Sequence, residues 1–386
     1  MKVLVGMSGG VDSTIAAYIL KKQGHEVVGV NFNFIESNFE TNNELVEIAD
    51  KLGIKVISRD FHHEFFERVI IPFVRDYENG ITPNPCALCN TTMKFDALIR
   101  VMKEGNADMV ATGHYANVVR IDNGSKTRYC IKKSANSQKD QSYMLYRLSQ
   151  EELSHIMFPL ADMDKNDVRK IAAELGLKVA EKKDSQDVCF IEHSKKKYSE
   201  YIKEFELGKD YRERIVKGEL SLDKIEEFPF FRKGEFVDED GKVLAYHDGI
   251  INYTIGQRKG LNIAFGERKF VKAINVDKNQ VVLSSNDGLM SRNFKIYDII
   301  FSGKSIDALG DMCSYITKLR YRHEGTLCDI DFSKFDYNDQ IINGANDKNF
   351  ASCHLSEPVR AITNGQAAVF YDEQDRIIFG GRIICD

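Results

Sequence analysis

The sequence predicts an α/β protein: a parallel sheet with helices at the N-terminus, a small central domain that is mostly β, and a β-barrel at the C-terminus. Two observations carry this prediction. Strand and helix patterns alternate over roughly the first two hundred residues, and such alternation is typical of a parallel sheet with right-handed crossovers. Short strands with turn signals dominate from residue 235 to the end, and this pattern favours a compact barrel.

The N-terminal part contains four apolar runs that we expect to be strands. They lie at residues 3–5, 26–34, 55–58 and 108–112. The segments between them are expected to be helices, over residues 14–20 and 40–52 and over a longer stretch in which Phe61, Phe65, Val69 and Phe73 recur every four residues. Because ligands lie at the carboxyl ends of such strands, we expect the glycine-rich turn after the first strand, Phe32 and Gly113 at one edge of the sheet.

The rest of the chain is predicted from its charge and its turn signals. Residues 205–232 are strongly charged and indicate a linker or a small charged insertion. A hairpin is expected over residues 235–244, turning at Asp240 and Gly241, and residues 366–371 are expected to pair with 376–379. These signals divide the chain into three domains, at residues 1–204, 205–282 and 283–386.

Bulk composition limits the classes of function. The chain of 386 residues carries a net charge of −5, so any surface for nucleic acid must be a local basic patch. No apolar run approaches the ~20 residues of a membrane span, and residues 8–10 interrupt any N-terminal signal sequence. Eight cysteines without a secretory signal indicate a reducing compartment, so we expect a cytoplasmic protein that makes no membrane contact.

The segment 8–13, Ser-Gly-Gly-Val-Asp-Ser, joins the first strand to the first helix. Two adjacent glycines let backbone N–H groups point inward together, and such a nest at a helix N-terminus holds an anion. Ser8 and Ser13 add hydroxyl donors, and Asp12 can accept from the N–H groups of the turn or help to hold a metal ion. The segment has neither the Gly-Lys-Ser/Thr of a Walker loop nor the G-x-G-x-x-G of a dinucleotide fold. An ordinary strand–helix turn is the plain structural alternative.

A proline-rich loop precedes two of the cysteines. Pro83 and Pro85 are expected to bar a helix until Asn90. Cys89 would then lie near a helix N-terminus, where the dipole lowers the pKa of a thiol and favours the thiolate. Cys86 completes a C-x-x-C pair with Cys89, so the loop is a candidate for thiol chemistry.

The cysteines also allow plainer interpretations. Cys189 ends a polar segment and opens a strand-like one, and alone it would be a buried small hydrophobe. The C-x-x-C pair could be half of a zinc site, but no second C-x-x-C or H-x-x-H is present to complete four ligands. The remaining cysteines show no motif and are expected to be packing residues: Cys130, Cys313, Cys328, Cys353 and Cys385.

The loop at 8–13 resembles the pyrophosphate loop of the PP-loop ATPases, which cleave ATP at the α-phosphate and adenylate a substrate. With its further motifs, the chain resembles the tRNA-specific 2-thiouridylases of the MnmA type over nearly its full length. The motifs that carry this resemblance lie at residues 6–13, 82–90, 111–115, 139–143, 184–191, 253–261 and 365–371. The resemblance implies an N-terminal PP-loop domain, like the adenine nucleotide α hydrolases, for ATP and catalysis, and a small central domain that binds tRNA.

The resemblance also implies a reaction, the ATP-dependent 2-thiolation of the wobble uridine in tRNA anticodons. ATP adenylates the C2 oxygen, pyrophosphate leaves, and a sulfur nucleophile displaces AMP to give 2-thiouridine. By resemblance Cys189 carries this sulfur as a persulfide, and Cys89 attacks the persulfide to release sulfide or closes a disulfide with Cys189; both need thiolate character. A cysteine desulfurase or a sulfur-relay protein is implied as the sulfur donor, and Mg²⁺ is implied with ATP.

Site residues are carried over by the resemblance alone. ATP is assigned to Gly6, Met7, Ser8, Gly9, Gly10, Val11, Asp12, Ser13, Phe32 and Gly113. Contact with tRNA is assigned to His114, Lys139, Asp140, Gln141, Arg320, Tyr321 and Gln366, and contact with the target base to Asn84, Pro85 and Cys86. Reaching C2 of that base requires taking the base out of its stack. Structural alternatives are a strand cap for His114 and solvated charges for Lys139 and Arg320.

Cys86 departs from the pattern of many family members, which have Asp at this position. The change removes a candidate acid–base carboxylate near the uridine and leaves three cysteines, Cys86, Cys89 and Cys189. Three thiolates cannot complete a structural zinc site, and no metal site is certain, but they could hold a [4Fe–4S] cluster with one iron open for sulfide. Residues 205–232 also form a longer segment than the family pattern has.

Two other classes of function stay open. One is a different PP-loop ligase or synthetase that acts on a small molecule, which would need neither paired cysteines nor a barrel for RNA. The other is a nucleotide-binding RNA chaperone whose cysteines are inert. Loss of tRNA thiolation in Cys89→Ser and Cys189→Ser variants would separate the sulfurtransferase from both.

Overall fold

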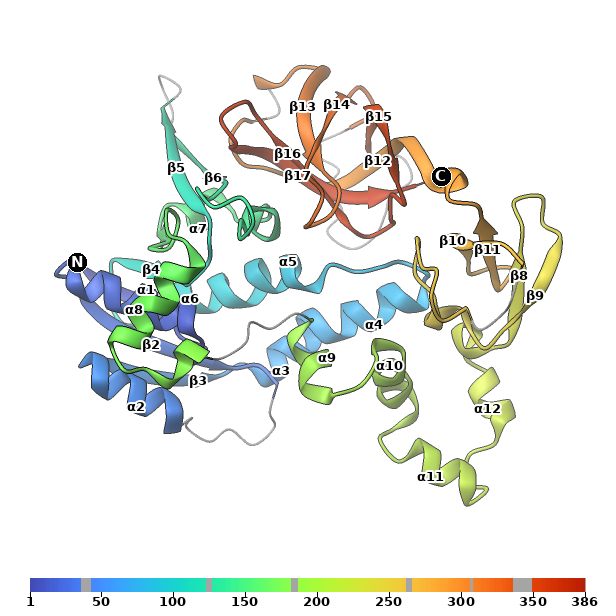
Figure 1. Ribbon diagram of the computed structural model, residues 1–386, viewed down its shortest axis with the longest axis horizontal. Coiled ribbons are helices and arrows are strands. Elements are labelled where there is room, and N and C mark those ends of the chain that lie inside the picture. Colours follow the sequence, from blue (N-terminus) through green and yellow to red (C-terminus); the bar gives the residue numbers. More distant parts are fainter. Residues whose placement is uncertain are drawn as a thin grey trace.

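The computed structural model describes residues 1–35, 43–122, 127–181, 187–261, 266–305, 308–335 and 349–385. It contains a parallel sheet with helices, a four-stranded central sheet and a closed barrel, which confirms the predicted fold class. Figure 1 shows the barrel above two long helical segments, with the parallel sheet and the central sheet at opposite ends of them. The first three residues of the helix expected at 40–52 and the start of the motif at 184–191 lie outside the described residues.

The N-terminal sheet has the strand order β3-β2-β1-β4-β7, and every neighbouring pair is parallel. Four of these strands confirm the predicted runs, and the two-residue β7 was not predicted. The strands are β1 (Lys2–Gly6), β2 (Glu26–Asn33), β3 (Lys55–Asp60), β4 (Met109–Ala111) and β7 (Ile156–Met157).

The two faces of this sheet are covered by different helices because successive side chains of a strand point to opposite sides. Val3 and Val5 of β1 pack with α1 (Val11–Lys22), α2 (Asn43–Leu52) and α8 (Lys165–Glu174). Leu4 points to the other face and packs in the cluster that contains Leu98 and Met102 of α6 (Asp96–Glu104). The sheet is therefore the middle of a three-layer unit.

Two continuous helical segments run between the sheet and the central domain (Figure 1). The first comprises α3 (His62–Phe65), the π-helical η1 (Phe66–Ile70) and α4 (Ile71–Glu78). The second comprises α5 (Pro85–Cys89), the π-helical η2 (Asn90–Phe95) and α6. The prediction that no helix forms before Asn90 is wrong, because proline at the first helical position lacks only an N–H that has no partner there anyway.

The charged segment 205–232 is largely helical, and its interpretation as a linker or a small charged insertion stays a prediction. It contains the end of α10 (Tyr198–Leu207), then α11 (Tyr211–Val216), α12 (Leu222–Glu226) and η5 (Pro229–Phe231). Leu207, Tyr211 and Leu220 are buried in the same cluster as Phe65 and Phe73 of the first helical segment. The charges occupy the outer faces of these helices, while their apolar sides complete a core.

The central sheet has the order β10-β11-β8-β9. Its strands are β8 (Gly234–Val237), β9 (Val243–His247), β10 (Phe270–Asn275) and β11 (Gln280–Ser284), with η6 (Ile250–Asn252) between β9 and β10. The antiparallel pair of β8 and β9 turns at Asp240 and Gly241, which confirms the predicted hairpin. Phe236, Val271 and Val281 pack into the cluster that holds segment 205–232, so this sheet and the helices share one core.

The C-terminal barrel closes in the order β12-β15-β14-β13-β16-β17, and all its pairs are antiparallel. Its strands, after η7 (Asp287–Leu289), are β12 (Met290–Phe301), β13 (Met312–Lys318), β14 (Thr326–Asp331), β15 (Ala351–Arg360), β16 (Ala367–Tyr371) and β17 (Ile377–Ile384). The pairing of β16 with β17 confirms the predicted one. Closure leaves no free sheet edge.

The hairpin of β5 (Asn117–Asp122) and β6 (Thr127–Lys132) leaves the N-terminal unit and lies beside the barrel (Figure 1). Arg128 donates from Nε to the carbonyl of Ser302 at 2.9 Å and from Nη2 to that of Phe301 at 3.1 Å. Lys133, just after β6, pairs with Asp375 at 2.6 Å. The remaining short elements of this unit are η3 (Ser142–Leu145), α7 (Gln150–Leu153), η4 (Lys178–Glu181) and α9 (Cys189–Ser194).

Two further predictions concern the chain as a whole. The boundaries at 204/205 and 282/283 fall inside α10 and β11, and the division into three domains at those points stays a prediction. Within the described ranges, every helix is too short or too polar to cross a membrane.

Candidate active site

The glycine-rich loop lies between β1 and α1 and is fixed to the neighbouring strand. The Met7 N–H donates to the carbonyl of Val30 at 2.8 Å, and the Asn31 side chain donates to the carbonyl of Met7 at 2.8 Å. Gly9 has a φ of +72°, which glycine adopts at little cost. The Ser13 hydroxyl donates to the carbonyl of Gly10 at 3.2 Å, so it braces the loop from within.

Gly113 and Phe32 lie where the strand order predicts, at the carboxyl edge beside this loop. A Cβ on Gly113 would lie 2.6 Å from the backbone carbon of Asp12 and from the nitrogen of Ser13, so only glycine fits. Phe32, near the end of β2, lies 5.6 Å from Phe34 and 5.4 Å from Phe61 between ring centroids. Two predicted nucleotide residues are thus brought to the predicted edge.

Asp12 has partners that the sequence did not indicate. Lys165 donates from Nζ to its two carboxylate oxygens at 2.8 and 2.7 Å, and the Tyr115 hydroxyl donates to Oδ1 at 2.8 Å. The Lys165 side chain is only 10% exposed, whereas that of Asp12 is 32% exposed. Sequence reasoning missed Lys165, because a lysine at the start of an amphipathic helix carries no distinguishing signal.

The second helical segment begins at the proline-rich loop. The Asn84 side chain accepts from the N–H of Ala87 at 3.3 Å, which caps α5, and Pro85 occupies the first turn. Cys86 is exposed and Cys89 is buried. The two thiols are separated by one helical turn, on a helix that starts four residues earlier than Cys89.

The expectation of a lowered thiol pKa at Cys89 is wrong. Burial raises the pKa of Cys89 to about 12, although the ammonium of Lys94 opposes the shift. The helix dipole cannot help, since Cys89 is the last residue of α5 and the helical turns of η2 follow it. This thiol is therefore neutral unless a charge or a substrate changes its surroundings.

Cys189 begins a helix, α9, rather than the expected strand-like segment. The residue is exposed, yet the atoms around its sulfur still raise the thiol pKa, while Lys94 lowers it. Phe190 beside it is buried and contacts Phe65 and Phe73 of the first helical segment, with centroids 5.9 and 5.0 Å apart. These contacts hold the start of α9 against the helices.

Lys94 brings the three cysteines into one electrostatic environment. Its ammonium lowers the pKa of Cys86, Cys89 and Cys189, and a thiolate at either Cys86 or Cys189 would raise that of Cys89. Lys94 was missed because it is one charge among several on a helix. Over the described ranges, no group of three or more His, Cys, Asp or Glu side chains is arranged to hold a metal ion, so the thiols form no ready ligand set.

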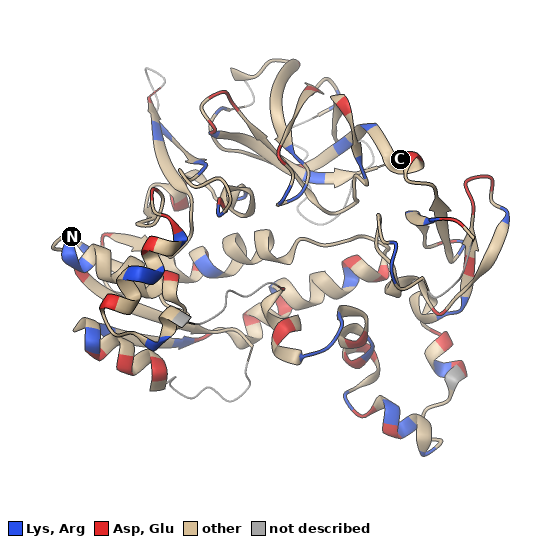
Figure 2. Cartoon of the chain, in the orientation of Figure 1, with Lys and Arg blue, Asp and Glu red and all other residues tan. Residues whose placement is uncertain are grey.

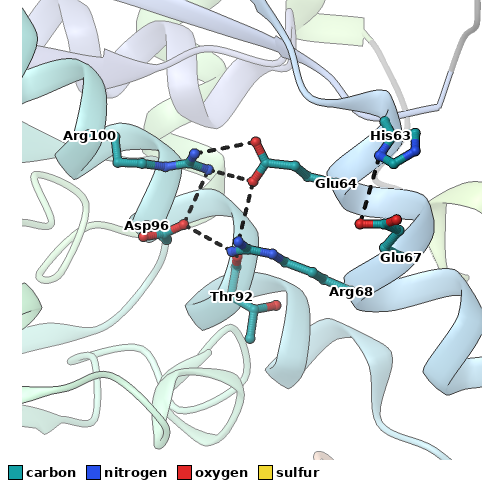
Figure 3. A network of polar contacts seen from close by, with 7 residues as sticks. All are labelled: His63, Glu64, Glu67, Arg68, Thr92, Asp96 and Arg100. Atoms are coloured by element: carbon teal, nitrogen blue, oxygen red, sulfur yellow. Dashed lines mark hydrogen bonds and ion pairs between the residues drawn. The ribbon is translucent and has the colours of Figure 1, made fainter.

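A network of charges joins the two helical segments next to the cysteines (Figure 3). Arg100 lies 2.8 Å from Glu64 and 3.2 Å from Asp96, and Arg68 lies 3.3 Å from Asp96. Arg68 also donates to the carbonyl of Thr92 at 3.3 Å, within the π-helical turn. The hydrogen bond from Arg100 lowers the pKa of Glu64, which therefore stays ionised. The network fixes the position of η2 relative to η1.

Two predicted tRNA contacts have their side chains turned to internal partners. Asp140 is buried and accepts from the N–H groups of Ser134 and Ser142 at 3.0 and 3.2 Å and from the Ser142 hydroxyl at 2.7 Å. Gln141 accepts from the N–H of Tyr115 at 2.9 Å. Both side chains order the turn before η3.

His114 follows β4 and is held in an aromatic setting. Its Nδ1 lies 2.7 Å from the Thr112 hydroxyl, and its ring lies 5.9 and 6.0 Å from those of Phe95 and Phe158. Burial lowers its pKa to about 3, so the imidazole is neutral at physiological pH. The contact with Phe95 places the start of α6 at the same sheet edge as the glycine-rich loop.

Three further predicted tRNA contacts lie in loops of the barrel. Arg320 is exposed and donates to the carbonyl of Arg360 at 3.1 Å, and Tyr321 is half-buried. Gln366 donates to the carbonyls of Thr82 and Pro83, so it lies against the proline-rich loop that precedes Cys86. Figure 2 shows Lys and Arg interspersed with Asp and Glu over all parts of the chain, consistent with a local rather than a global basic surface.

Comparisons with known proteins cover almost the whole chain. Residues 1–193 match the family described as the tRNA methyl transferase HUP domain, residues 223–285 the tRNA methyl transferase PRC-barrel domain, and residues 291–384 the Aminomethyltransferase beta-barrel domain.

Full-length relatives are similar along the same span. The tRNA-specific 2-thiouridylase MnmA of Lachnoclostridium phytofermentans is 37% identical over 399 residues, which covers 99% of each chain. The tRNA-specific 2-thiouridylase MnmA 1 of Clostridium tetani is 38% identical over 392 residues, which covers 99% of this chain and 96% of that protein. A solved structure, the U34-tRNA thiolase NcsA from Methanococcus maripaludis with its [4Fe-4S] cluster, is 19% identical over 56% of this chain and 70% of that one, with a TM-score of 0.32.

Proposed function

The chain belongs to the tRNA-specific 2-thiouridylase (MnmA) family, and on this premise we propose that it is an ATP-dependent tRNA-uridine 2-sulfurtransferase that acts on the wobble uridine. One structural observation supports the assignment more than any other. The thiols of Cys86, Cys89 and Cys189 share the electrostatic environment of Lys94, and the neighbouring Phe95 lies against His114, at the edge of the sheet where the glycine-rich loop lies. Activation of an oxygen and attack by sulfur need these two sites next to each other.

ATP would bind at the carboxyl edge of the sheet. In this proposal the loop from Gly6 to Ser13 holds the phosphates, and Phe32 and Gly113 border the nucleotide. Asp12 is already paired with Lys165, so Mg²⁺ bound with ATP would take its oxygen ligands from phosphate and water. Such an ion neutralises phosphate charge, and Lys165 would fix the orientation of Asp12 at the loop.

Sulfur transfer would use the two cysteines assigned by the family. Cys189, exposed at the start of α9, is accessible to a sulfur donor, for which we propose a cysteine desulfurase or a sulfur-relay protein. The outer sulfur of the Cys189 persulfide attacks C2, and AMP leaves with the former C2 oxygen. Cys89, buried one turn below Cys86, then attacks the Cys189 sulfur; the S–S bond to the sulfur on C2 breaks, 2-thiouridine is released, and the Cys89–Cys189 disulfide that remains is reduced by an external thiol. The positive charge of Lys94 favours each thiolate in turn.

The tRNA would lie between the N-terminal unit and the barrel. We propose contacts to Lys139, to the backbone of Asp140 and Gln141, to Arg320 and Tyr321, and to the neutral ring of His114, with the target base near Asn84, Pro85 and Cys86. A cytoplasmic location is proposed with them, because all eight cysteines are free, as a reducing compartment would keep them.

A cluster-dependent version of the same reaction is the second candidate. Its support is the convergence of Cys86, Cys89 and Cys189, the three ligands that a [4Fe–4S] cluster with one open iron needs. Among the described residues these thiols are not arranged as a group that could hold a metal ion, so the residues as they lie do not fit such a cluster. Anaerobic reconstitution with iron and sulfide analysis separates the two: iron-free protein that thiolates tRNA with a persulfide donor excludes the cluster.

The decisive experiment is tRNA thiolation with purified components. The protein, ATP, Mg²⁺, unmodified tRNA and a persulfide donor are combined, and nucleosides are analysed by mass spectrometry. We expect 2-thiouridine with the native protein and with Cys313→Ser, a control on the barrel, but none with Cys89→Ser or Cys189→Ser. Undiminished product with both cysteine variants would instead favour a different PP-loop enzyme or an RNA chaperone.

A further inference from the structure

The barrel contacts the proline-rich loop directly, although the two are far apart in the sequence. The side-chain amide of Gln366 donates from Nε2 to the carbonyls of Thr82 and Pro83 at 3.1 and 3.0 Å. In return, the N–H of Thr82 donates to the carbonyl of Asn364 at 3.0 Å. These bonds join the turn before β16 to the two residues that precede Asn84, and Asn84 caps α5.

The loop needs donors from elsewhere because of its own sequence. Pro83 and Pro85 have no N–H, so neither can donate to a carbonyl of the loop. Buried carbonyls without a donor are costly, and Pro83 is buried. A single amide that donates to two successive carbonyls fixes the direction of the chain as it enters the helix.

The fit between turn and loop is close. Gly365 has a φ of +86°, and a Cβ there would lie 2.2 Å from Cγ2 of Ile81 and 2.8 Å from the carbonyl oxygen of Thr82. A side chain at this position would therefore displace the loop. The loop therefore contacts the turn at two places, the backbone at Gly365 and the side-chain amide of Gln366.

Two ion pairs hold the barrel in place independently of this turn. Asp76 at the end of α4 pairs with Arg382 of β17 at 2.8 Å, and Arg147 pairs with Asp298 of β12 at 2.7 Å. Both pairs line a cavity of about 70 Å³ beneath the proline-rich loop. Because these pairs and Arg128 remain, removal of the Gln366 amide should leave the barrel docked.

We propose that Gln366 is a positioning residue for sulfur transfer: its amide sets the start of α5 through Thr82, Pro83 and Asn84, and thereby the places of Cys86 and Cys89. The inference rests on the sulfurtransferase function proposed above and deepens it. It assigns the barrel a part in aligning the catalytic thiols, besides binding tRNA. The Nε2 atom of Gln366 is engaged with the loop, so only Oε1 is left to face a tRNA.

The test replaces Gln366 by Met, which keeps the length of the side chain and removes the amide, and by Glu, which removes both donors. We expect the single-turnover rate of thiolation at saturating tRNA to fall about tenfold or more, which corresponds to about 1.4 kcal/mol. The Kd for tRNA should stay within about twofold. Gln374→Glu, on the exposed turn between β16 and β17, serves as the control that leaves both quantities unchanged.

A second readout does not depend on activity. In the absence of tRNA and ATP, we expect Cys86 to react with iodoacetamide at a rate several-fold faster in Gln366→Met than in the native chain, with an unchanged urea midpoint. A higher Kd with an unchanged rate at saturation would make Gln366 a tRNA contact only and overturn the proposal. An unchanged alkylation rate would overturn it as well. Failure of the native protein to thiolate tRNA, with altered alkylation in the variant, would reject the function but not the positioning.

Discussion

Lys165 and Asp12 form a two-pronged ion pair, 2.8 and 2.7 Å from Nζ to the two carboxylate oxygens, at the loop expected to hold phosphate. The lysine comes from α8 and the aspartate from α1, so the pair connects two helices on one face of the sheet. A lysine so engaged carries little free charge toward a phosphate. Its effect is to hold the carboxylate in one orientation beside the glycine turn.

This pair predicts a strong effect of Lys165→Met on adenylation. The change leaves the Asp12 carboxylate with the Tyr115 hydroxyl but without its cation, so the carboxylate is no longer held in one orientation beside the glycine turn. We expect ATP–pyrophosphate exchange to fall at least about a hundredfold, and Asp12→Ala to abolish it. Lys170→Met, on the exposed side of α8, is the matched control. Full exchange in the Asp12 or Lys165 variant would contradict the assignment of the loop.

The thiols predict a dependence of thiolation on Lys94 and on pH. Lys94 lowers the pKa of Cys86, Cys89 and Cys189, so Lys94→Met should raise all three and reduce thiolate at pH 8. We expect the pH profile of thiolation to move to higher pH, with a rate about tenfold lower at pH 7.5. Lys94→Arg should restore it, and Lys103→Met, an exposed charge on the same helical segment, should not alter it. A profile that Lys94→Met leaves in place would show that this charge does not act on the reacting thiols.

Stability should fall as the pH rises toward neutrality because of Glu78. Burial and the carboxyl of Glu206 raise the pKa of Glu78 from its usual 4.5 to about 7, although the positive charge of Arg75 lowers this pKa. Between these values the folded chain keeps a proton that the unfolded chain has lost. The stabilisation is complete below pH 4.5 and disappears as the pH rises through 7.

Glu78→Gln should therefore flatten the dependence of the urea midpoint on pH and stabilise the protein at pH 8. After allowance for solvent screening of this half-buried group, the gain is about 1 kcal/mol. Glu213→Gln on the exposed face of α11 should leave the slope as it is. The same slope in Glu78→Gln as in the native chain would mean that another group is responsible.

His114 should not titrate in the physiological range. Burial lowers its pKa to about 3, so its NMR signals should keep their positions between pH 5 and 8. Binding of tRNA should consequently show no pH dependence from this residue. A midpoint near 6.5 for His114 would require a site more open to water than the one described.

Local patterns in the sequence were sufficient to predict the elements whose conformation depends mainly on neighbouring residues. The apolar runs at 3–5, 26–34 and 55–58 became β1, β2 and β3, and the glycine pair became a loop at the end of β1, because strand and turn propensities depend on neighbouring residues. The helix at Pro85 was missed because proline was expected to prevent helix formation, although the first helical turn tolerates proline. The loss of thiolate character at Cys89 comes from burial, which the local sequence does not record.

Long-range partners could not be predicted in this way. Lys165 lies 153 residues from Asp12, and Gln366 lies 284 residues from Thr82. Lys94 acts on Cys189 from another helix. These side chains look like ordinary surface charges or amides until the fold brings them together, so only the resemblance singled out Gln366, and it assigned a different role.

The contact between Gln366 and Pro83 also bears on how the protein is made. A ribosome adds about 5 to 20 residues per second, so the 283 positions between these residues delay their meeting by about 15 to 60 s. From the synthesis of Cys189 until that of Gln366 the nascent chain has its glycine-rich loop and all three thiols, but α5 lacks its contact with Gln366. A chain cut short before Gln366 would keep every residue named in the reaction and lack the alignment that Gln366 gives them.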